Sequence, residues 1–172
     1  EVARQAFVGV TAEEMAADDA RRQADGLPYR FAVPVDVALT PQNAGTWESL
    51  PDGRSLWRLR VGSPGVLSLN LGFTRTALPA GARLLVYPAA DPAAARRLDD
   101  EERSGHGQIW TPVFLTDELV VELTVPQSLR AAVDLELSSV GRGYRFFGEN
   151  DSDKSGTCNV DVICPEGDDW RG

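Results

Sequence analysis

Residues 55–73 read SLWRLRVGSPGVLSLNLGF, two alternating runs joined by the turn sequence GSPG. In each run an apolar residue recurs at every second position with small or polar residues between, which is the pattern of a β-strand with one buried face. The recurring apolar residues are Trp57, Leu59 and Val61, then Leu67, Leu69, Leu71 and Phe73. We therefore predict strands at 55–61 and 66–73, with Trp57 in the core.

The same period of two recurs along most of the chain. Further strands are expected at 29–39, 47–50, 83–87, 108–114, 118–125, 132–139 and 144–147. Pro34 has no N–H to donate, so the strand that contains it belongs at a sheet edge or carries a bulge. About eight or nine short strands at near-regular spacing predict an all-β fold. We expect an antiparallel two-sheet β-sandwich, jelly-roll-like, with one short N-terminal helix and a disordered C-terminal linker.

The helix is predicted ahead of the first strand. Residues 1–10 show little periodicity and are expected to be a loose arm. Thr11 and Glu14 have the spacing of a capping box, so a short helix should run from 12 to 24 and stop before Gly26. Its apolar residues are mostly alanine, so we expect it to be weakly anchored to the body. Its charged residues are expected to pair at i,i+3 and i,i+4 on a solvated face: Asp18, Asp19, Arg21 and Arg22.

Composition sets the broad class of the protein. The chain has 172 residues, 42% of them hydrophobic, and a net charge of −9, which fits one globular domain with tails. An acidic balance without a basic patch argues against nucleic acid as a partner. No apolar run approaches the ~20 residues that span a bilayer, so no membrane partner is expected, and the start EVARQAF lacks the apolar core of a signal peptide.

No residue of the chain has the surroundings of a catalytic group. His106, the only histidine, lies between glycines in SGHG and is expected to be an exposed loop residue, not a base or a zinc ligand. The acidic run Asp99–Glu102 lies among arginines and is expected to be a solvated charged loop, not a calcium site. We predict no metal, no cofactor and no enzymatic activity for this chain.

The end of the chain has a different character. From Gly148 to Thr157 no apolar side chain is longer than a methyl group, so this stretch cannot join a core and is predicted to be a flexible linker. It contains Lys154, the only lysine in the chain. A single lysine in an exposed acidic segment is either an accident of an arginine-rich composition or one cleavage point for a lysine-specific protease.

The sequence after the linker is CNVDVICPEGDDWR, at 158–171. It resembles the mature amino terminus of the bacterial lysyl endopeptidases, secreted serine proteases of chymotrypsin-like fold. Upstream, the phrases TWESLPDGRSLWRLRV, SPGVLSLNLGF and WTPVF resemble the pro-region of such enzymes. The resemblance implies four parts: an N-terminal arm and short helix at 1–28, a β-sandwich pro-domain at 29–147, a processing linker at 148–157 and the first residues of the protease at 158–172.

The resemblance also implies a function. The pro-domain would assist the folding of the catalytic domain of its own protease, inhibit that domain while attached, and be removed by cleavage between Lys154 and Ser155. It implies a secreted bacterial protein, extracellular or periplasmic, whose signal peptide is absent from this chain. Arg58, Arg60 and the acidic loop are candidate docking groups.

Cys158 and Cys164 are the only cysteines. In an extended strand their spacing holds the Cα atoms too far apart for one disulfide, although a turn could bring them together. The resemblance implies that each pairs with a partner further along the protease, which this chain lacks. A local bridge and two reduced thiols are the alternatives.

The main alternative function is a carbohydrate- or ligand-binding β-sandwich module of a secreted protein. Such modules present flat aromatic platforms on a β-face, and Trp110 and Trp47 are the candidate platform residues. A purely structural sandwich is the third possibility. A pro-domain predicts cleavage at Lys154 and affinity for a protease, a carbohydrate module predicts polysaccharide binding through an exposed tryptophan, and a structural sandwich predicts neither.

Overall fold

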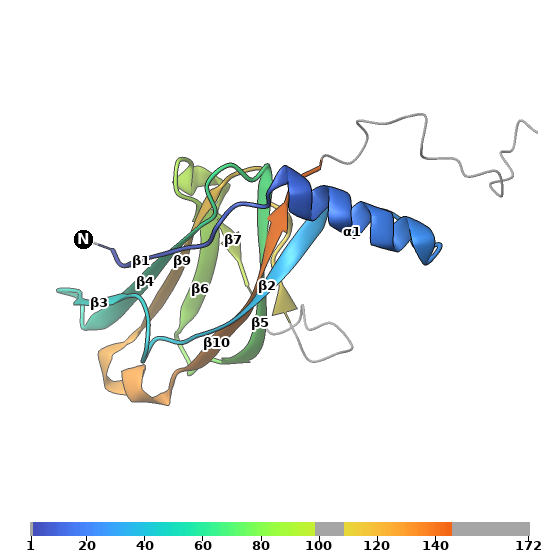
Figure 1. Cartoon of the computed structure of the whole chain (residues 1–172). Coiled ribbons are helices and arrows are strands. Elements are labelled where there is room, and N and C mark those ends of the chain that lie inside the picture. The colour runs from blue at the N-terminus through green and yellow to red at the C-terminus, as the bar shows by residue number, and fades with distance from the viewer. Residues whose placement is uncertain (1, 99–108, 146–172) are drawn as a thin grey trace, which may run out of the picture.

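The computed structural model describes residues 2–98 and 109–145, which form two β-sheets packed face to face (Figure 1). The six-stranded sheet has the order β1-β4-β9-β6-β7, with β3 also paired to β4. Its strands are β1 (Arg4–Ala6), β3 (Thr46–Ser49), β4 (Arg54–Gly62), β6 (Arg83–Pro88), β7 (Arg96–Arg97) and β9 (Glu118–Pro126). The four-stranded sheet has the order β2-β10-β5-β8, with β2 (Ala32–Leu39), β5 (Ser68–Ala77), β8 (Ile109–Trp110) and β10 (Asp134–Gly143).

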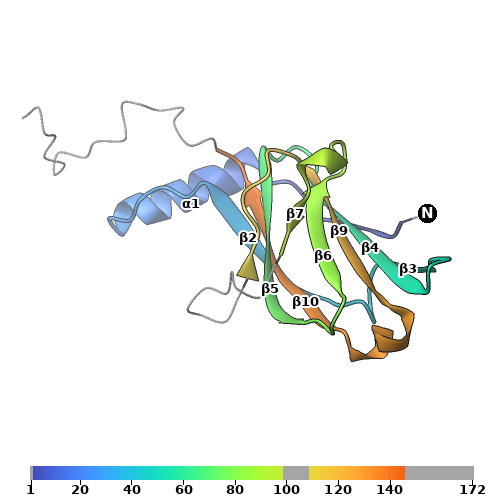
Figure 2. The same cartoon turned by 180° about the vertical axis from the view of Figure 1, so that it is seen from behind.

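Three helical segments complete the described chain. They are α1 (Ala12–Ala24) and the short 3-10 helices η1 (Pro92–Ala94) and η3 (Gln127–Ala132). The capping box at the start of α1 is confirmed, since the Glu14 N–H donates to Thr11 Oγ1 at 3.1 Å and the Thr11 N–H donates to Glu14 Oε2 at 2.8 Å. In both views α1 extends away from the sandwich on the side of the four-stranded sheet (Figures 1 and 2).

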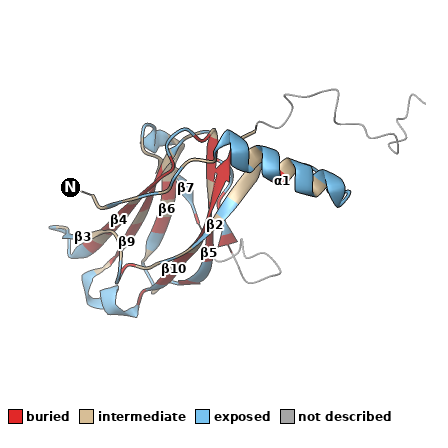
Figure 3. Ribbon diagram, in the orientation of Figure 1, coloured by how far each residue is buried: buried red, intermediate tan, exposed pale blue. Residues whose placement is uncertain are grey.

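The core lies between the two sheets and is built from the alternating apolar residues of their central strands. Buried positions therefore alternate along much of β4, β6 and β9, whereas residues 139–143 of β10 are buried at every position (Figure 3). The side chains with the lowest exposure include Trp57, Leu59 and Val61 of β4, Leu69, Leu71 and Phe73 of β5, Leu119, Val121 and Leu123 of β9, and Leu135, Leu137 and Val140 of β10. The predicted two-sheet sandwich with an N-terminal helix is confirmed, whereas these strand orders do not establish a jelly roll.

The stretch 55–73 forms β4 and the start of β5, as predicted, and Trp57 is 1% exposed. Beyond Phe73 the alternation shifts because Thr74 is an extra residue in the pairing with β10. Leu137 lies opposite Phe73, and Glu136 lies opposite Arg75. After this bulge Thr76 is buried, while Thr74 and Arg75 are both exposed.

The prediction for Pro34 is confirmed. It lies in β2, at the edge of the four-stranded sheet, opposite Gly141 of β10. An edge strand tolerates proline because one of its two sides has no partner strand to receive an N–H.

The prediction of a loose arm at residues 1–10 is wrong for residues 4–6. They form β1, which runs parallel to β4, with Arg4 opposite Arg60 and Ala6 opposite Gly62. β3 pairs with the other half of the same edge of β4. A strand of three residues is too short to show a period of two, so the sequence pattern did not reveal it.

Two predicted strands near the C-terminal end differ from the structure. The strand expected at 108–114 is reduced to β8, because Pro112 cannot donate and Phe114 returns only as an isolated bridge to Leu69. β10 does not end at 139 but continues to Gly143. The separate strand predicted at 144–147 is wrong at 144 and 145, which follow β10 outside any strand, and 146–147 lie outside the described residues.

Candidate functional site

The residues predicted to take part in processing all lie outside the described part of the chain. These are Lys154, Ser155, Cys158 and Cys164, and the same holds for the acidic run at 99–102 and for His106. The last described residue, Arg145, follows β10 directly. The described residues that remain candidates lie on the two outer faces of the sandwich and around Arg145.

Arg145 attaches the end of β10 to helix α1. Its Nη1 donates to Asp19 Oδ1 at 3.0 Å, and its Nη2 forms a second hydrogen bond with Asp19 Oδ2. These bonds raise the pKa of the Arg145 guanidinium above its usual value. The guanidinium also lies 5.2 Å from the ring centroid of Tyr29. One arginine thus holds together α1, the segment before β2 and the end of the described chain.

Asp18 is the buried member of the same helix face, with only 6% of its surface exposed. Its Oδ1 accepts from Arg21 at 2.8 Å and lies 3.9 Å from Arg30. The expected i,i+3 pair is therefore present, but the prediction that this face is solvated is wrong, because Asp18 is buried and Asp19 pairs with Arg145. Burial raises the pKa of the neighbouring Tyr144, and the charge of Asp19 acts in the same direction. The helix is anchored to the body by polar groups.

The outer face of the six-stranded sheet is covered by ion pairs. Glu118 accepts hydrogen bonds from Arg4, at 2.6 Å, and from Arg60. Burial opposes the ionisation of Glu118, but the bonds from Arg60 and Arg4 prevail and hold its pKa below the usual range. Arg58 donates to Glu48 at 3.0 Å. Both arginines suggested as docking groups are thus paired with carboxylates of their own sheet.

Tyr87 extends this polar face onto β6. Its hydroxyl donates to Glu122 Oε2 at 2.9 Å. Burial, together with that hydrogen bond and the charge of Glu122, raises the pKa of Tyr87 to about 12. The phenol is therefore neutral at ordinary pH and acts as a donor.

The outer face of the four-stranded sheet differs along the first part of β5, where its side chains are mostly small, whereas at the far end Arg75 of β5 pairs with Asp134 and Glu136 of β10. Leu69, Leu71 and Val140 point into the core, so the residues between them point outward. Three rows of paired residues cross this face: Ala32–Gly143–Ser68, Pro34–Gly141–Asn70 and Asp36–Ser139–Gly72–Trp110. We call this surface the flat face.

Three glycines give the flat face its low relief. A Cβ added to Gly141 would meet Asn70 Oδ1 at 1.9 Å, and one added to Gly143 would meet Ser68 Oγ at 1.9 Å. A Cβ added to Gly72 would lie 2.8 Å from the indole ring of Trp110. The neighbouring side chains therefore lie across the glycines, along the sheet. No local pattern in the sequence singles out these three glycines.

The two tryptophans proposed as a ligand platform are not brought together. Trp110 lies on β8 of the four-stranded sheet and is 37% exposed. Trp47 lies on β3 of the six-stranded sheet, where its Nε1 donates to the Pro41 carbonyl at 3.0 Å. The Arg130 guanidinium covers the Trp47 ring at 4.2 Å from its centroid, so that face is not open for a sugar to stack on.

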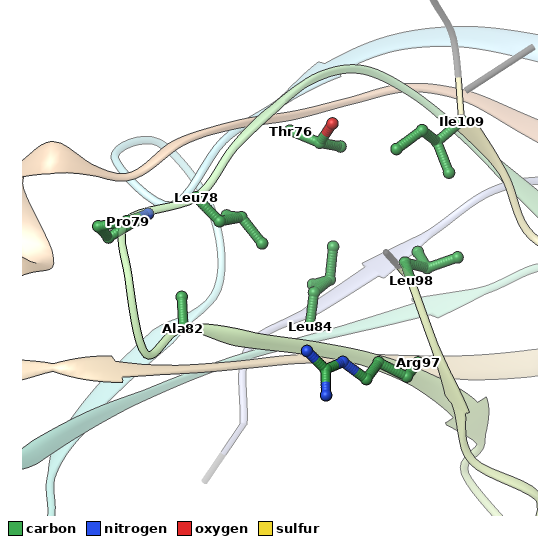
Figure 4. Close-up of a pocket in the computed structure, with 8 residues that line it drawn as sticks. All are labelled: Thr76, Leu78, Pro79, Ala82, Leu84, Arg97, Leu98 and Ile109. Carbon is green, nitrogen blue, oxygen red and sulfur yellow. The ribbon is translucent and has the colours of Figure 1, made fainter. Parts of the chain in front are cut away.

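Two cavities border the sandwich. The first, of about 140 Å³, is lined mainly by apolar residues between the sheets, namely Thr76, Leu78, Pro79, Ala82, Leu84, Arg97, Leu98 and Ile109 (Figure 4). It is well below the roughly 300–1,000 Å³ of a small-molecule site. The second is an open groove of about 760 Å³ beside Trp47 and Arg130, and its lining contains no acidic residue.

Two further classes of site were considered. Within residues 2–98 and 109–145, no group of three or more His, Cys, Asp or Glu side chains is placed to hold a metal ion. In the same ranges, no helix is both long and apolar enough to cross a bilayer.

Comparison with known proteins agrees with the resemblance seen in the sequence. The family model of the lysyl endopeptidase N-terminal domain matches residues 6–141, from the end of β1 into β10. The lysyl endopeptidase of Pseudomonas aeruginosa is 28% identical over 155 residues, which cover 81% of this chain and 32% of that protein. The chain thus spans about a third of that relative's length, and no solved structure matches. Because the matched region contains nearly the whole sandwich, the chain belongs to the lysyl endopeptidase N-terminal domain family.

Proposed function

We propose that this chain is the pro-domain of a secreted, lysine-specific serine endopeptidase, followed by a processing linker and the first residues of the protease. The observation that carries the proposal is the family match across a sandwich with its own core, placed ahead of a segment that contains the only lysine. The domain acts on the catalytic domain of its own precursor and is not itself an enzyme.

The domain has two roles while it is attached. As a folding assistant, it binds the forming catalytic domain and stabilises it, because anything that binds the folded form and not the unfolded one shifts the equilibrium toward folding. As an inhibitor, it covers the active site. The short connection between the two domains gives a high effective concentration, so that weak docking is enough for inhibition.

Cleavage after Lys154 ends both roles. Lys154 follows Arg145 by nine positions, so an extended connection reaches at most about 30 Å from the anchored end of β10. Cutting between Lys154 and Ser155 converts the linked inhibitor into a free one, which dissociates on dilution. Cys158 and Cys164 then remain with the protease and form disulfides there.

The proposal is tested by incubating the 172-residue chain with mature lysyl endopeptidase and following both intact mass and residual protease activity. We expect one rapid cut, a new amino terminus SGTCNV, and a surviving domain that inhibits the enzyme. Lys154→Ala is the control and should remain uncut and inhibit for longer. Brief exposure to trypsin, which cuts after both arginine and lysine, should also cut at Lys154 before any arginine in a strand, because the backbone of a strand is held by its sheet partners. A chain that neither inhibits the protease nor is cut at Lys154 would exclude the proposed role.

A further inference from the structure

The two outer faces of the sandwich differ in a way that points to a partner. On the six-stranded sheet, long charged side chains pair with one another, as Glu118 does with Arg4 and Arg60. The three rows of the flat face contain one ionisable residue, Asp36, and otherwise small or uncharged side chains. Five of the ten residues in these rows are themselves buried, so the face presents mainly Ala32, Pro34, Asp36, Asn70 and Trp110. A nearly uncharged patch of low relief is suited to receiving another protein.

Exposed apolar residues gather around the same sheet. Tyr29 and Phe31, just before β2, are 42% and 41% exposed, and Val113 and Leu115, just after β8, are 48% and 73% exposed. Trp110 lies on β8 itself. Among the described residues, the strands of the six-stranded sheet contain no large apolar residue exposed to this degree, although Val8, two residues after β1, is 80% exposed. Exposed apolar residues thus lie beside both edges of this sheet, which fits a surface that contacts a partner.

The course of the chain identifies the occupant. β10 lies in the interior of the four-stranded sheet, and the described residues end at Arg145, two positions beyond that strand. Helix α1 extends from the sandwich on the same side and is bound to that end by Asp19 and Arg145 (Figure 1). Whatever follows in the precursor is therefore tethered at the end of a strand of this sheet, and the Pseudomonas relative is about three times as long as the segment that matches.

The area of the flat face decides whether this sheet alone can form a stable interface. Four strands at about 4.8 Å spacing and rows extending about 15 Å along them give an area on the order of 300 Å². A stable complex buries about 800 Å² on each partner, so the sheet alone is too small. Helix α1, at about 1.5 Å per residue, adds an arm roughly 20 Å long on the same side.

We propose that the flat face and helix α1 together form the surface on which this domain docks to the catalytic domain of its own precursor. The inference rests on the proposed function and specifies which surface performs it. A second copy of this chain could also cover the face, but a tethered partner has the higher effective concentration.

The test places an arginine at the centre of the flat face. Asn70→Arg and Pro34→Arg each put a long cation on the middle row, and Pro34 lies on an edge strand where the change leaves the core untouched. Thr124→Arg is the matched control, since Thr124 is half-buried and points outward between Leu123 and Val125 of β9. All three are made in the Lys154→Ala chain so that no cleavage occurs. Inhibition constants are measured against the mature protease with a small lysyl substrate, with light scattering and thermal unfolding on each variant.

We expect both flat-face variants to inhibit about tenfold less tightly or worse, because a charge enters the centre of the interface, and Thr124→Arg to change inhibition by less than about twofold. Folded flat-face variants that inhibit like the parent would overturn the inference and leave the proposed function standing. The inference would also be overturned if the parent is a dimer and Pro34→Arg makes it a monomer without changing its inhibition constant. A parent chain that does not inhibit at all would instead refute the proposed function, and this inference with it.

Discussion

Gly45 offers the sharpest test of how the sandwich is packed. It has φ +79°, and a Cβ added there would lie 2.2 Å from Nε1 of Trp57. That nitrogen now donates to the carbonyl of Ala44 at 2.8 Å. Gly45→Ala therefore imposes left-handed strain, about 1–2 kcal/mol, and displaces an indole whose lost hydrogen bond costs a further 1–3 kcal/mol or so.

Gly53→Ala separates these two effects. Gly53 has φ +81°, but a Cβ there meets nothing within 4 Å, so only the strain of about 1–2 kcal/mol should remain. Urea denaturation followed by tryptophan fluorescence gives the free energy of unfolding of each variant. We expect Gly45→Ala to be less stable than Gly53→Ala by about 1–3 kcal/mol, and this excess should shrink when Trp57→Phe is the background. Equal costs at the two glycines, or an excess unchanged by Trp57→Phe, would refute the reasoning.

Three further predictions follow from the polar contacts. Glu118→Gln should cost only about 1 kcal/mol, because its arginine partners are half exposed and water screens the pairs. Since the folded pKa of Glu118 is lowered, this difference should be present above the unfolded value near 4.5 and fade as the pH falls below it, which acid titrations of both proteins would show. The pKa of Tyr87 is raised to about 12, so the parent should lose stability as the pH rises from about 10 toward 12, and Tyr87→Phe should flatten that loss in alkaline denaturation. Asp19→Asn removes an ionic partner of Arg145. Trypsin should then cleave after Arg145 several-fold faster, while the midpoint of thermal unfolding shifts by only a few degrees. An unchanged cleavage rate would mean that this ion pair does not hold the end of β10.

The period of two was enough to predict most of the sandwich, because the buried strands alternate strictly. Trp57 in the core, Pro34 on an edge and the capping box at Thr11 each rested on one local rule, and the structure confirms all three. The alternation did not reveal β1, because three residues are fewer than two periods. It also could not reveal the bulge at Thr74, since an extra residue is recognised only from its partner strand.

The candidate surface was harder to predict than the fold. Two arginines on one face of a predicted strand, Arg58 and Arg60, are candidate docking groups from the sequence. In the structure they pair with Glu48 and Glu118 from other strands. The flat face depends on Gly141 and Gly143 lying beside Asn70 and Ser68, residues about 70 positions away in the chain. Such neighbours are set by strand order, which a single sequence does not display. The family resemblance, by contrast, was carried by short local motifs, and the comparison confirms it.

The strand order also has a consequence for the timing of synthesis. In the six-stranded sheet β9 lies between β4 and β6, and in the four-stranded sheet β10 lies between β2 and β5. Both strands that join earlier ones come from the last part of the described chain. A nascent polypeptide that has not reached Pro126 lacks β9, and one that has not reached Gly143 still lacks β10. The domain therefore becomes foldable as a unit only when its final strand has emerged. In the proposed precursor this is the moment just before the protease itself begins to appear, so the assistant is completed immediately ahead of the domain that it serves.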